Sequence, residues 1–494
     1  MRRQTKIVCT IGPASCSPEM IERLIDAGMD VARLNFSHGS HESHKERIKI
    51  IREVSARKNA NVAILMDLQG PKIRTGKLIP PHVVNLEPGA SITVTTDKIV
   101  GDVNRISTTY ANLPHDVKPG DRILLSDGTL ELCVESVAPP EVHCTVVRGG
   151  ELGESKGINL PGVSIAEPSL TDKDRIDVAL SIAEKVDFVA LSFVRSPDDI
   201  RGLRELLRES NSDIGIVAKI ERPEALVHIK EIAALSDAVM VARGDLGVEV
   251  NFEDVPSIQK TLINSCNELG VPVITATQML ESMVYAGRPT RAEVTDVANA
   301  IYDGTDAVML SAETASGKYP VEACTVMARV AAKTDAETQR TSTDRRMREL
   351  RRDELKKRRE GMRGVHLNSY ADAIGQAVFR MCESLDITRI VCFTKTGYTA
   401  GAIARYRPRV RITAITNRES TCRKCAIMWG VSAVLTKDFD LIEVMVHEVE
   451  EQLLRHKAAA EGDTIIIVAG TPLAEGGRTN MLKLHTVGDS GDDI

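Results

Sequence analysis

Short apolar segments alternate with longer amphipathic ones along most of the chain. This rhythm predicts a parallel β-sheet with helices packed outside it. Helix signals follow several strands: Ser17-Pro18 can open a helix that Gly28 closes, and Ser196-Pro197 can open another. The strand candidates are KIVCTIG (6–12), DVARLNFS (30–37), AILMDLQG (63–70), DFVALSFV (187–194), GIVAKIE (215–221), AVMVARGDLG (238–247), PVITATQ (272–278) and AVMLSAETA (307–315). Because most of these eight segments end in polar residues, they predict an α/β fold, a (β/α)8 TIM barrel with its chemistry on one face.

Residues 71–168 interrupt this rhythm with alternating apolar and polar positions. The alternation is typical of antiparallel strands, and Asp127-Gly128 is a hairpin turn signal. The strand candidates here are SITVTT (91–96), RISTTY (105–110), RILLSDGTLELCVESV (122–137) and HCTVVRGG (143–150). We therefore expect barrel segments at 1–70 and 169–339, with a small all-β lid inserted after the third barrel strand.

The composition changes again after the barrel. Residues 340–363 carry eleven basic and five acidic residues, which fits either a solvated linker or a basic arm for an acidic partner. The linker is favoured, because the segment has no aromatic residue and the whole chain has a net charge of −6. Beyond it, RIVCFTK (389–395), RITAITN (411–417) and DTIIIVAG (463–470) alternate with helices. They predict a C-terminal α/β domain at 364–488.

Composition limits the function classes. With 494 residues and 43% apolar residues, the chain is expected to form about three domains. The acidic net charge argues against nucleic acid or an anionic membrane as the main partner, and no apolar run reaches the length of a membrane span. The ten cysteines lack a disulfide spacing, which favours a cytoplasmic location. Cys422 and Cys425 are interpreted as incidental thiols rather than a zinc pair, since no second pair or histidine lies at a suitable spacing.

Charged residues follow two neighbouring strands of the predicted barrel. Strand alternation places Lys219 and Glu221 on the same inward side, and the next strand ends in Arg243-Gly244-Asp245. A lysine, two carboxylates and a glycine that lets backbone approach a ligand suit Mg²⁺ and a phosphate. A lone K-x-E pattern is weak, but two adjacent strand ends of this kind are rarely a packing accident.

Seven longer motifs connect the chain to a known family. They are RLNFSHG (33–39), MDLQGPKIRTG (66–76), KGINLPG (156–162), AKIERPEAL (218–226), MVARGDLGVE (240–249), ATQMLESM (276–283) and RPTRAEVTDVANAIYDGTDAVMLSAETASGKYP (288–320). In this order, they resemble the signature segments of the pyruvate kinases, and the resemblance runs from about Thr5 to Val487. It implies transfer of the phosphoryl group of phosphoenolpyruvate to ADP, giving pyruvate and ATP in the final step of glycolysis.

The resemblance also implies roles for individual residues. Glu221 and Asp245 would bind Mg²⁺ or Mn²⁺, and Lys219 would stabilise the phosphoryl group in flight. Substrate binding would involve Arg33, Lys219, Gly244, Asp245 and Thr277, whereas Thr277, Ser311 and Glu313 are the candidates for proton transfer to the enolate. The nucleotide would contact Asn35, Ser37, His38, Arg74 and Lys156. Lys156 lies on the lid, so lid closure would complete the site.

One departure from the family pattern concerns K⁺. Many members bind this ion at positions matching Asn35, Ser37, Asp67 and Leu68, and carry a glutamate where this chain has Lys72. An ammonium group there could replace the ion. Leu68-Gln69 also fits a K⁺-independent subgroup, whereas Thr75 resembles the K⁺-requiring members. We therefore expect that activity does not require K⁺.

Two further features remain open to more than one interpretation. His38, His41 and His44 could form a metal site, but His38 belongs to a family motif and a solvated helix face is favoured for the other two. The loop formed by Thr394, Lys395, Thr396, Gly397 and Thr399 fits either an ordinary turn or an effector-phosphate site. The resemblance favours a phosphorylated allosteric effector there, and it implies a homotetramer.

Two alternative functions share part of this pattern. A metal-dependent aldolase of the phosphoenolpyruvate/pyruvate type would share the carboxylates but would not need Lys219, Arg74 or a nucleotide-binding lid. A non-catalytic relative would be expected to lack a metal ligand or Lys219, and the chain retains all of them. The sequence therefore favours the active kinase.

Overall fold

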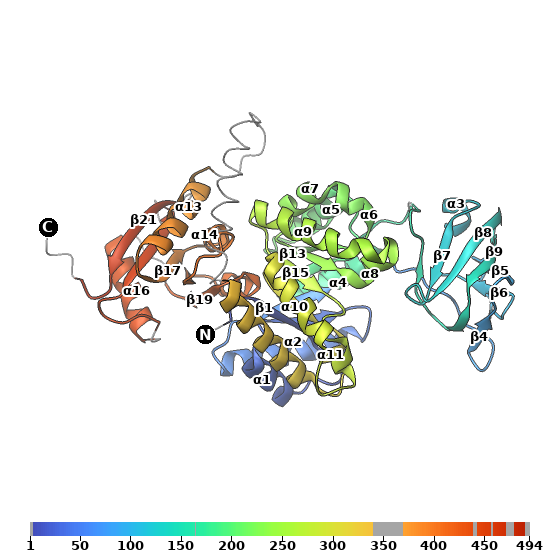
Figure 1. Ribbon diagram of the computed structural model, residues 1–494, viewed down its shortest axis with the longest axis horizontal. Helices are drawn as coiled ribbons and strands as arrows, with labels where there is room; N and C mark the ends of the chain where they lie inside the picture. The colour runs from blue at the N-terminus through green and yellow to red at the C-terminus, as the bar shows by residue number, and fades with distance from the viewer. Residues whose placement is uncertain are drawn as a thin grey trace.

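The computed structural model describes residues 3–163, 165–338, 369–437, 442–455, 458–470 and 479–489. Three bodies follow one another in space: an all-β body at one end, the barrel in the centre and the C-terminal body at the other end (Figure 1). The predicted linker at 340–363 lies outside the described residues.

The central body is a closed barrel of eight parallel strands, as the sequence predicted. The strand order is β1-β16-β15-β14-β13-β12-β3-β2, with neighbouring strands in parallel register. The strands are β1 (Lys6–Thr10), β2 (Val31–Asn35), β3 (Ala63–Asp67), β12 (Phe188–Leu191), β13 (Gly215–Ile220), β14 (Ala238–Ala242), β15 (Val273–Ala276) and β16 (Ala307–Leu310). Their carboxyl ends therefore meet on one rim.

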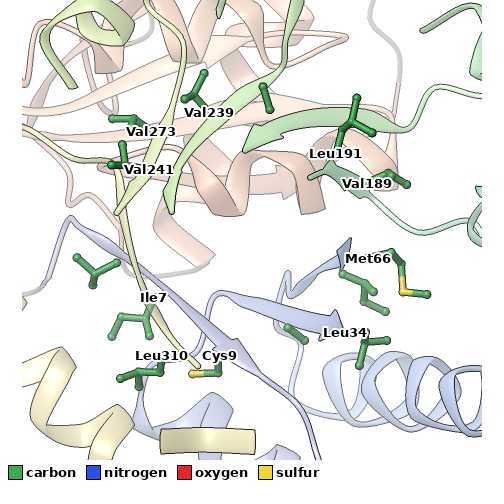
Figure 2. Packing of buried hydrophobic residues seen from close by; sticks show 14 of the residues in the cluster. Ile7, Cys9, Leu34, Met66, Val189, Leu191, Val239, Val241, Val273 and Leu310 are labelled. Carbon is green, nitrogen blue, oxygen red and sulfur yellow. The ribbon is translucent and has the colours of Figure 1, made fainter. Parts of the chain in front are cut away.

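Side-chain alternation divides the core into two layers. Val8, Val31 and Met240 belong to a buried cluster that draws on all eight strands and so fills the barrel interior. The alternate positions pack outward against the helices; Figure 2 shows Ile7, Cys9 and Leu310 of this outer cluster close together on the neighbouring strands β1 and β16. Residues in phase with the inner cluster at the strand ends must therefore project into the mouth of the barrel.

The helix signals read from the sequence are confirmed. Helix α1 (Pro18–Ala27) has Ser17 as its N-cap and ends at Gly28, whose φ of 119° is left-handed. Helix α5 (Pro197–Glu209) follows Ser196. The other barrel helices are α2 (His41–Arg57), α4 (Asp172–Ala183), α6 (Pro223–Val227), α7 (Ile229–Leu235), α8 (Arg243–Glu249), α9 (Val255–Leu269), α10 (Arg291–Asp303), α11 (Ala312–Ala315) and a helix through 320–338.

The inserted body leaves the barrel after β3 and returns before α4. It contains a six-stranded sheet in the order β11-β7-β8-β9-β5-β6 and a two-stranded sheet of β10 and β4, around its own buried core. The turn at Ser126, Asp127 and Gly128 joins β7 to β8, as the hairpin signal predicted. The elements are β4 (Val83–Leu86), β5 (Ser91–Thr95), β6 (Arg105–Ser107), α3 (Leu113–Asp116), β7 (Arg122–Leu125), β8 (Leu130–Ala138), β9 (Glu141–Arg148), β10 (Gly150–Gly153) and β11 (Ile158–Asn159).

The C-terminal body is a second α/β unit, as predicted. Its five-stranded sheet has the order β19-β18-β17-β20-β21, in which only the last pair is antiparallel. The elements are α13 (Ser369–Ser384), β17 (Ile387–Phe393), α14 (Tyr398–Ala404), β18 (Arg411–Thr416), α15 (Glu419–Lys424), β19 (Val431–Leu435), α16 (Ile442–Arg455), β20 (Thr464–Gly470) and β21 (Thr479–Thr486).

The cysteines and helices bear on two further expectations. All ten cysteines are free thiols. Cys422 and Cys425 are both buried, and the described residues contain no cluster of three or more histidine, cysteine, aspartate or glutamate side chains suited to a metal. Nor does any helix in the described part of the chain combine the length and apolarity needed to cross a bilayer.

Candidate active site

The carboxyl ends of adjacent barrel strands bring charged side chains into the mouth. Arg33 on β2, Asp67 on β3 and Lys219 on β13 are each in phase with the inner cluster, so they point inward where the strands end. Glu221 follows on the same phase just beyond β13. Strand order and alternation therefore place two cations and two carboxylates at one rim of a barrel that is apolar below them.

Lys219 is surrounded by acceptors. Its Nζ lies 2.8 Å from Glu221 Oε1, 3.1 Å from Asp67 Oδ1 and 2.7 Å from Ser192 Oγ, and its side chain is 10% exposed. Burial disfavours the ammonium form, but the charges of Asp67 and Glu221 outweigh that cost and raise the pKa of Lys219. The lysine is thus a fixed positive charge, suited to stabilising a transferring phosphoryl group and unsuited to acting as a base.

Asp67 pairs with a second cation. Arg33 donates from Nε to Asp67 Oδ2 at 2.7 Å and from Nη1 to Thr10 Oγ1 at 2.9 Å. Burial alone would raise the pKa of Asp67, but Lys219 and Arg33 lower it. Asp67 therefore fixes the two cations expected to face the substrate phosphate.

Glu221 and Asp245 form the carboxylate side of the mouth. Burial raises the pKa of Glu221, Lys219 lowers it, and the negative charge of Asp245 raises it again. Mutual repulsion between a buried carboxylate, Glu221, and the partly buried Asp245 is a situation that a divalent cation relieves. Mg²⁺ commonly takes one or two carboxylates while keeping water and substrate oxygens as its other ligands. The two residues therefore fit a divalent ion.

Thr277 occupies a strained position beside this pair. It follows β15 with a φ of 68°, which is unusual for a β-branched residue, and its Oγ1 accepts a 2.7 Å hydrogen bond from the Gly244 amide. Arg243 holds the strained turn by donating to the carbonyl oxygens of Ala276, Thr277 and Gln278, while Asp296 Oδ2 lies 2.7 Å from its Nη1. The Thr277 hydroxyl is thereby fixed next to the first turn of α8, which carries Gly244 and Asp245.

Ser311 and Glu313 follow β16 on the same rim. Glu313 is fully buried and accepts hydrogen bonds from the amides of Leu280 (3.1 Å) and Ser311 (2.6 Å), although burial still raises its pKa. Ser311 Oγ is buried without a partner in the described structure. An unpartnered hydroxyl in a polar cleft is suited to a water or substrate oxygen.

The predicted nucleotide residues lie in two places. Asn35 ends β2, and Ser37 and His38 lie in the loop that follows; Asn35 Oδ1 accepts from the Ser37 amide at 3.0 Å. Arg74 and Lys156 lie together at the base of the lid: Arg74 Nη1 donates to the Ser155 carbonyl at 2.9 Å.

The solvated-face interpretation of the histidines is wrong for His44. This residue is fully buried, its ring packs against Phe36 with centroids 4.6 Å apart, and its Nε2 donates to the His38 carbonyl oxygen at 2.9 Å. The spacing correctly placed His41 and His44 in the first turns of a helix, but it gave no information on which face of that helix is buried. His41 instead lies 2.7 Å from Asp177.

At the predicted monovalent-cation position, the Asp67 carboxylate and the Leu68 carbonyl already have partners within the protein. Asp67 binds Arg33 and Lys219, and the Leu68 carbonyl accepts a 2.7 Å hydrogen bond from Ser192 Oγ. Lys72 begins the lid connection, and its side chain passes Gly157 of the lid, whose added Cβ would lie 3.9 Å from Lys72 Cε. Within the described residues Lys72 forms no ion pair with Asp67.

The predicted effector loop is an ordered turn between β17 and α14. Thr394 Oγ1 accepts from the Gly397 amide at 2.9 Å, and the Lys395 carbonyl accepts from Thr421 Oγ1 at 2.8 Å. Thr399 is buried, and its hydroxyl bonds to that of Thr479. Thr396 Oγ1 accepts a long bond from the Tyr398 amide.

Several residues of the mouth escaped the sequence reasoning. Ser192, Thr10 and Arg243 each contact a predicted site residue. Thr10 ends β1, and Ser192 directly follows β12. Their place at strand ends of the predicted barrel is the sequence signal that could have identified them.

The fold and the mouth define a (β/α)8-barrel protein of the kind whose chemistry lies at the carboxyl rim, with cations and carboxylates gathered there beside an inserted β-sheet body. The model described as pyruvate kinase, barrel domain matches residues 2–324, and the model described as pyruvate kinase, alpha/beta domain matches residues 372–485. The chain belongs to the pyruvate kinase family. It is a phosphotransferase that converts phosphoenolpyruvate and ADP to pyruvate and ATP, the last step of glycolysis.

Individual relatives agree with this assignment. Pyruvate kinases of Staphylococcus aureus strains MRSA252 and USA300 are 47% identical to the chain over 489 residues, covering 99% of this chain and 81% of each relative. The crystal structure of a pyruvate kinase from Cryptosporidium parvum superposes with a TM-score of 0.90 at 37% identity, covering 98% of this chain and 96% of that one. The family depends in general on a divalent metal.

Proposed function

We propose that Lys219, Glu221 and Asp245 carry out the phosphoryl transfer, with Mg²⁺ or Mn²⁺ held by the two carboxylates. The observation that carries this proposal is Lys219 Nζ fixed between Asp67 and Glu221 at 3.1 and 2.8 Å, beside a second carboxylate on α8. When bound, the ion would supply positive charge to the phosphoryl and enolate oxygens. The chain contributes positioning and charge, which is how phosphoryl transfer is generally catalysed.

Neighbouring groups are proposed to hold the substrate. Arg33 presents a guanidinium that Asp67 and Thr10 orient, and a planar donor of this kind suits the phosphate of phosphoenolpyruvate. The backbone at Gly244 and Asp245 and the Thr277 hydroxyl would receive the carboxylate of the substrate. The support is that these residues lie together, since the Gly244 amide donates to Thr277 Oγ1 at 2.7 Å.

The proton that converts enolate to pyruvate is proposed to arrive through Thr277 and Ser311. Ser311 Oγ is buried without a protein partner, so it can bind a water that supplies the proton, and Glu313 fixes the backbone beside it. Asn35, Ser37, His38, Arg74 and Lys156 would contact the phosphates of ADP. Closure of the lid would bring Lys156 to them and exclude water.

A metal-binding measurement tests the central role. Glu221→Gln should weaken Mn²⁺ binding by about tenfold or more in calorimetry, because an amide replaces a charged ligand. Glu268→Gln, on an exposed surface ion pair with Lys230, is the matched control and should bind like the unmodified enzyme. Unchanged Mn²⁺ affinity in Glu221→Gln would remove this residue from the metal site.

Lys72 is proposed to make the enzyme independent of K⁺. The support is its position on the lid connection, which leaves the barrel directly after the strand that ends at Asp67. Pyruvate formation in K⁺-free buffer is expected to reach about the rate found with K⁺. Lys72→Glu should then introduce a K⁺ requirement. A strong K⁺ requirement in the unmodified enzyme would contradict the proposal.

The regulatory and cellular expectations are also proposals. The turn at 394–399 is proposed to bind a phosphorylated effector, supported by the internal hydrogen bonds that pre-order its backbone. A homotetramer and a cytoplasmic location are proposed from the family and from ten free thiols. The net charge of −6 supports the absence of a nucleic-acid partner.

A further inference from the structure

The segment that returns from the lid is fixed to the barrel rim by two arginines. Arg222 Nη2 donates to the Val163 carbonyl at 2.8 Å, and Arg195 donates to the carbonyls of Ile165 and Glu167. Arg222 follows β13 and Arg195 follows β12, so neighbouring strand ends hold three carbonyls of this segment. The lid connection therefore has a fixed point on the same rim that carries the catalytic groups.

One side chain of the lid sheet itself contacts this rim. Asn159, in β11, donates from Nδ2 to Glu249 Oε1 at 3.0 Å, and Glu249 Oε2 lies 2.9 Å from Arg222 Nη1. The tip of the β7–β8 hairpin lies nearby, since a Cβ built on Gly128 would be 3.5 Å from Val248. The lid thus rests on the C-terminal end of α8.

Both barrel residues of this contact belong to segments that carry the catalytic groups. Arg222 directly follows Glu221, and Glu249 ends the helix whose first turn holds Gly244 and Asp245. Lys156 and Asn159 lie in the same short segment of the lid. Asn159, Glu249 and Arg222 therefore connect the nucleotide side of the cleft to the metal side through three side chains.

The contact is buried, which makes its geometry demanding. The side chains of Arg222 and Glu249 are 3% and 1% exposed. Burial raises the pKa of Glu249, whereas Arg222 and the Asn159 amide lower it. A buried carboxylate that loses a hydrogen-bond donor is destabilised, because its desolvation is no longer compensated. Lid positions in which the Asn159 amide donates to Glu249 are therefore favoured over positions in which it does not.

We propose that Glu249 is a positioning residue for the lid: paired with Arg222, it docks Asn159 and so fixes where Lys156 stands relative to the metal carboxylates. This inference rests on the proposed role of Lys156 in binding ADP. Loss of the docking contact leaves the substrate pocket on the barrel intact. It changes only the position of Lys156 and therefore weakens only the binding of the nucleotide.

Asn159→Asp tests the proposal, because the substitution keeps the shape but places a carboxylate against Glu249. The KM for ADP should rise about tenfold, the scale of a lost hydrogen bond to a charged group, while the dissociation constant of phosphoenolpyruvate with Mg²⁺ changes less than twofold. Asn112→Asp is the matched control: Asn112 is an exposed lid residue with no capping bond, and its substitution should leave both constants unchanged.

A double variant that exchanges the donor and the acceptor of this hydrogen bond provides the decisive comparison. In Asn159→Asp with Glu249→Gln, the glutamine amide can donate to the new carboxylate, so the KM for ADP should return to within about threefold of the unmodified enzyme. A double variant as weak as Asn159→Asp overturns the proposal, and so does an equal loss of phosphoenolpyruvate affinity, which would indicate general damage.

Lys156→Met, measured in the same series, separates this inference from the proposed function. If Lys156→Met raises the KM for ADP and Asn159→Asp does not, the docking role is wrong and the nucleotide role stands. If Lys156→Met leaves the KM for ADP unchanged, the nucleotide role of Lys156 is itself wrong.

Discussion

At the scale of single residues, the mouth of the barrel balances buried charges against one another. Lys219 and Arg33 share Asp67, and Glu221 faces both Lys219 and Asp245. Lys219, Arg33 and Asp67 would each be costly to bury alone, so each depends on the opposite charges beside it to stay ionised. The K-x-E alternation predicted that Lys219 and Glu221 share a side. Asp67 was not foreseen as a partner of Lys219 because its strand, β3, is separated from β13 in the sequence by the whole lid, and Ser192 was missed although it follows the preceding barrel strand.

Replacing Asp67 should expose this dependence as a loss of stability. Asp67→Asn removes the carboxylate that Arg33 and Lys219 share and leaves Lys219 with Glu221 alone, so unfolding at pH 7 should require about 3–5 kcal/mol less free energy. Because the pKa of Asp67 is lowered, its contribution is present above the pKa of the unfolded chain and disappears as the pH falls through the lowered value.

The pH dependence distinguishes a charge effect from a packing effect. Urea unfolding of the two proteins should give midpoints that converge as the pH falls below about 4, near the unfolded pKa of an aspartate. Midpoints that stay equally far apart from pH 7 to pH 3 would show that Asp67 stabilises the barrel by shape alone.

At the scale of elements, the barrel strands were predictable because each is a short apolar run followed by a helix. The strands that were missed are short or lie at sheet edges: β4, β10 and β11 in the lid, and β19 and β21 in the C-terminal body. β11 has only two residues, and its pairing with β7 depends on tertiary contacts. Local periodicity carries little signal for such elements.

The segment that leads from β3 into the lid has a geometry that depends on Gly70. Its φ is 66°, its amide donates to Asp174 Oδ1 at 3.1 Å, and an added Cβ would lie 2.9 Å from the Phe193 ring. Gly70→Ala should displace the connection, so kcat/KM for ADP should fall about tenfold or more while the lid keeps its own fold.

Gly89→Ala is the matched control for this change. Gly89 lies in the lid with a φ of 84°, and nothing stands within 4 Å of an added Cβ. It therefore carries the backbone strain without the collision. Equal kinetics for Gly70→Ala and Gly89→Ala would show that contact at the connection does not place the lid.

At the scale of the whole molecule, the opposite end of the barrel is joined to the C-terminal body. Arg407 Nη1 lies 2.9 Å from Asp306 Oδ1, which also accepts from the Trp429 amide, and Trp429 Nε1 donates to Asp335. Asp306 directly precedes β16, and Ser311 follows that strand. A single strand thus runs from the domain contact to the active rim. The sequence predicted both bodies but not this contact, because its partners are more than a hundred residues apart for Arg407 and Asp306.

The most direct test of the account is a steady-state assay of pyruvate formation from phosphoenolpyruvate, ADP and Mg²⁺, run on the full chain and on Lys219→Met. Pyruvate formation should depend on ADP, and the variant should lose about 10³-fold in kcat, the scale of removing a key charge-stabilising donor, with its circular dichroism spectrum unchanged. Substantial turnover in a folded Lys219→Met variant would contradict the central claim that this lysine stabilises the phosphoryl group in transfer.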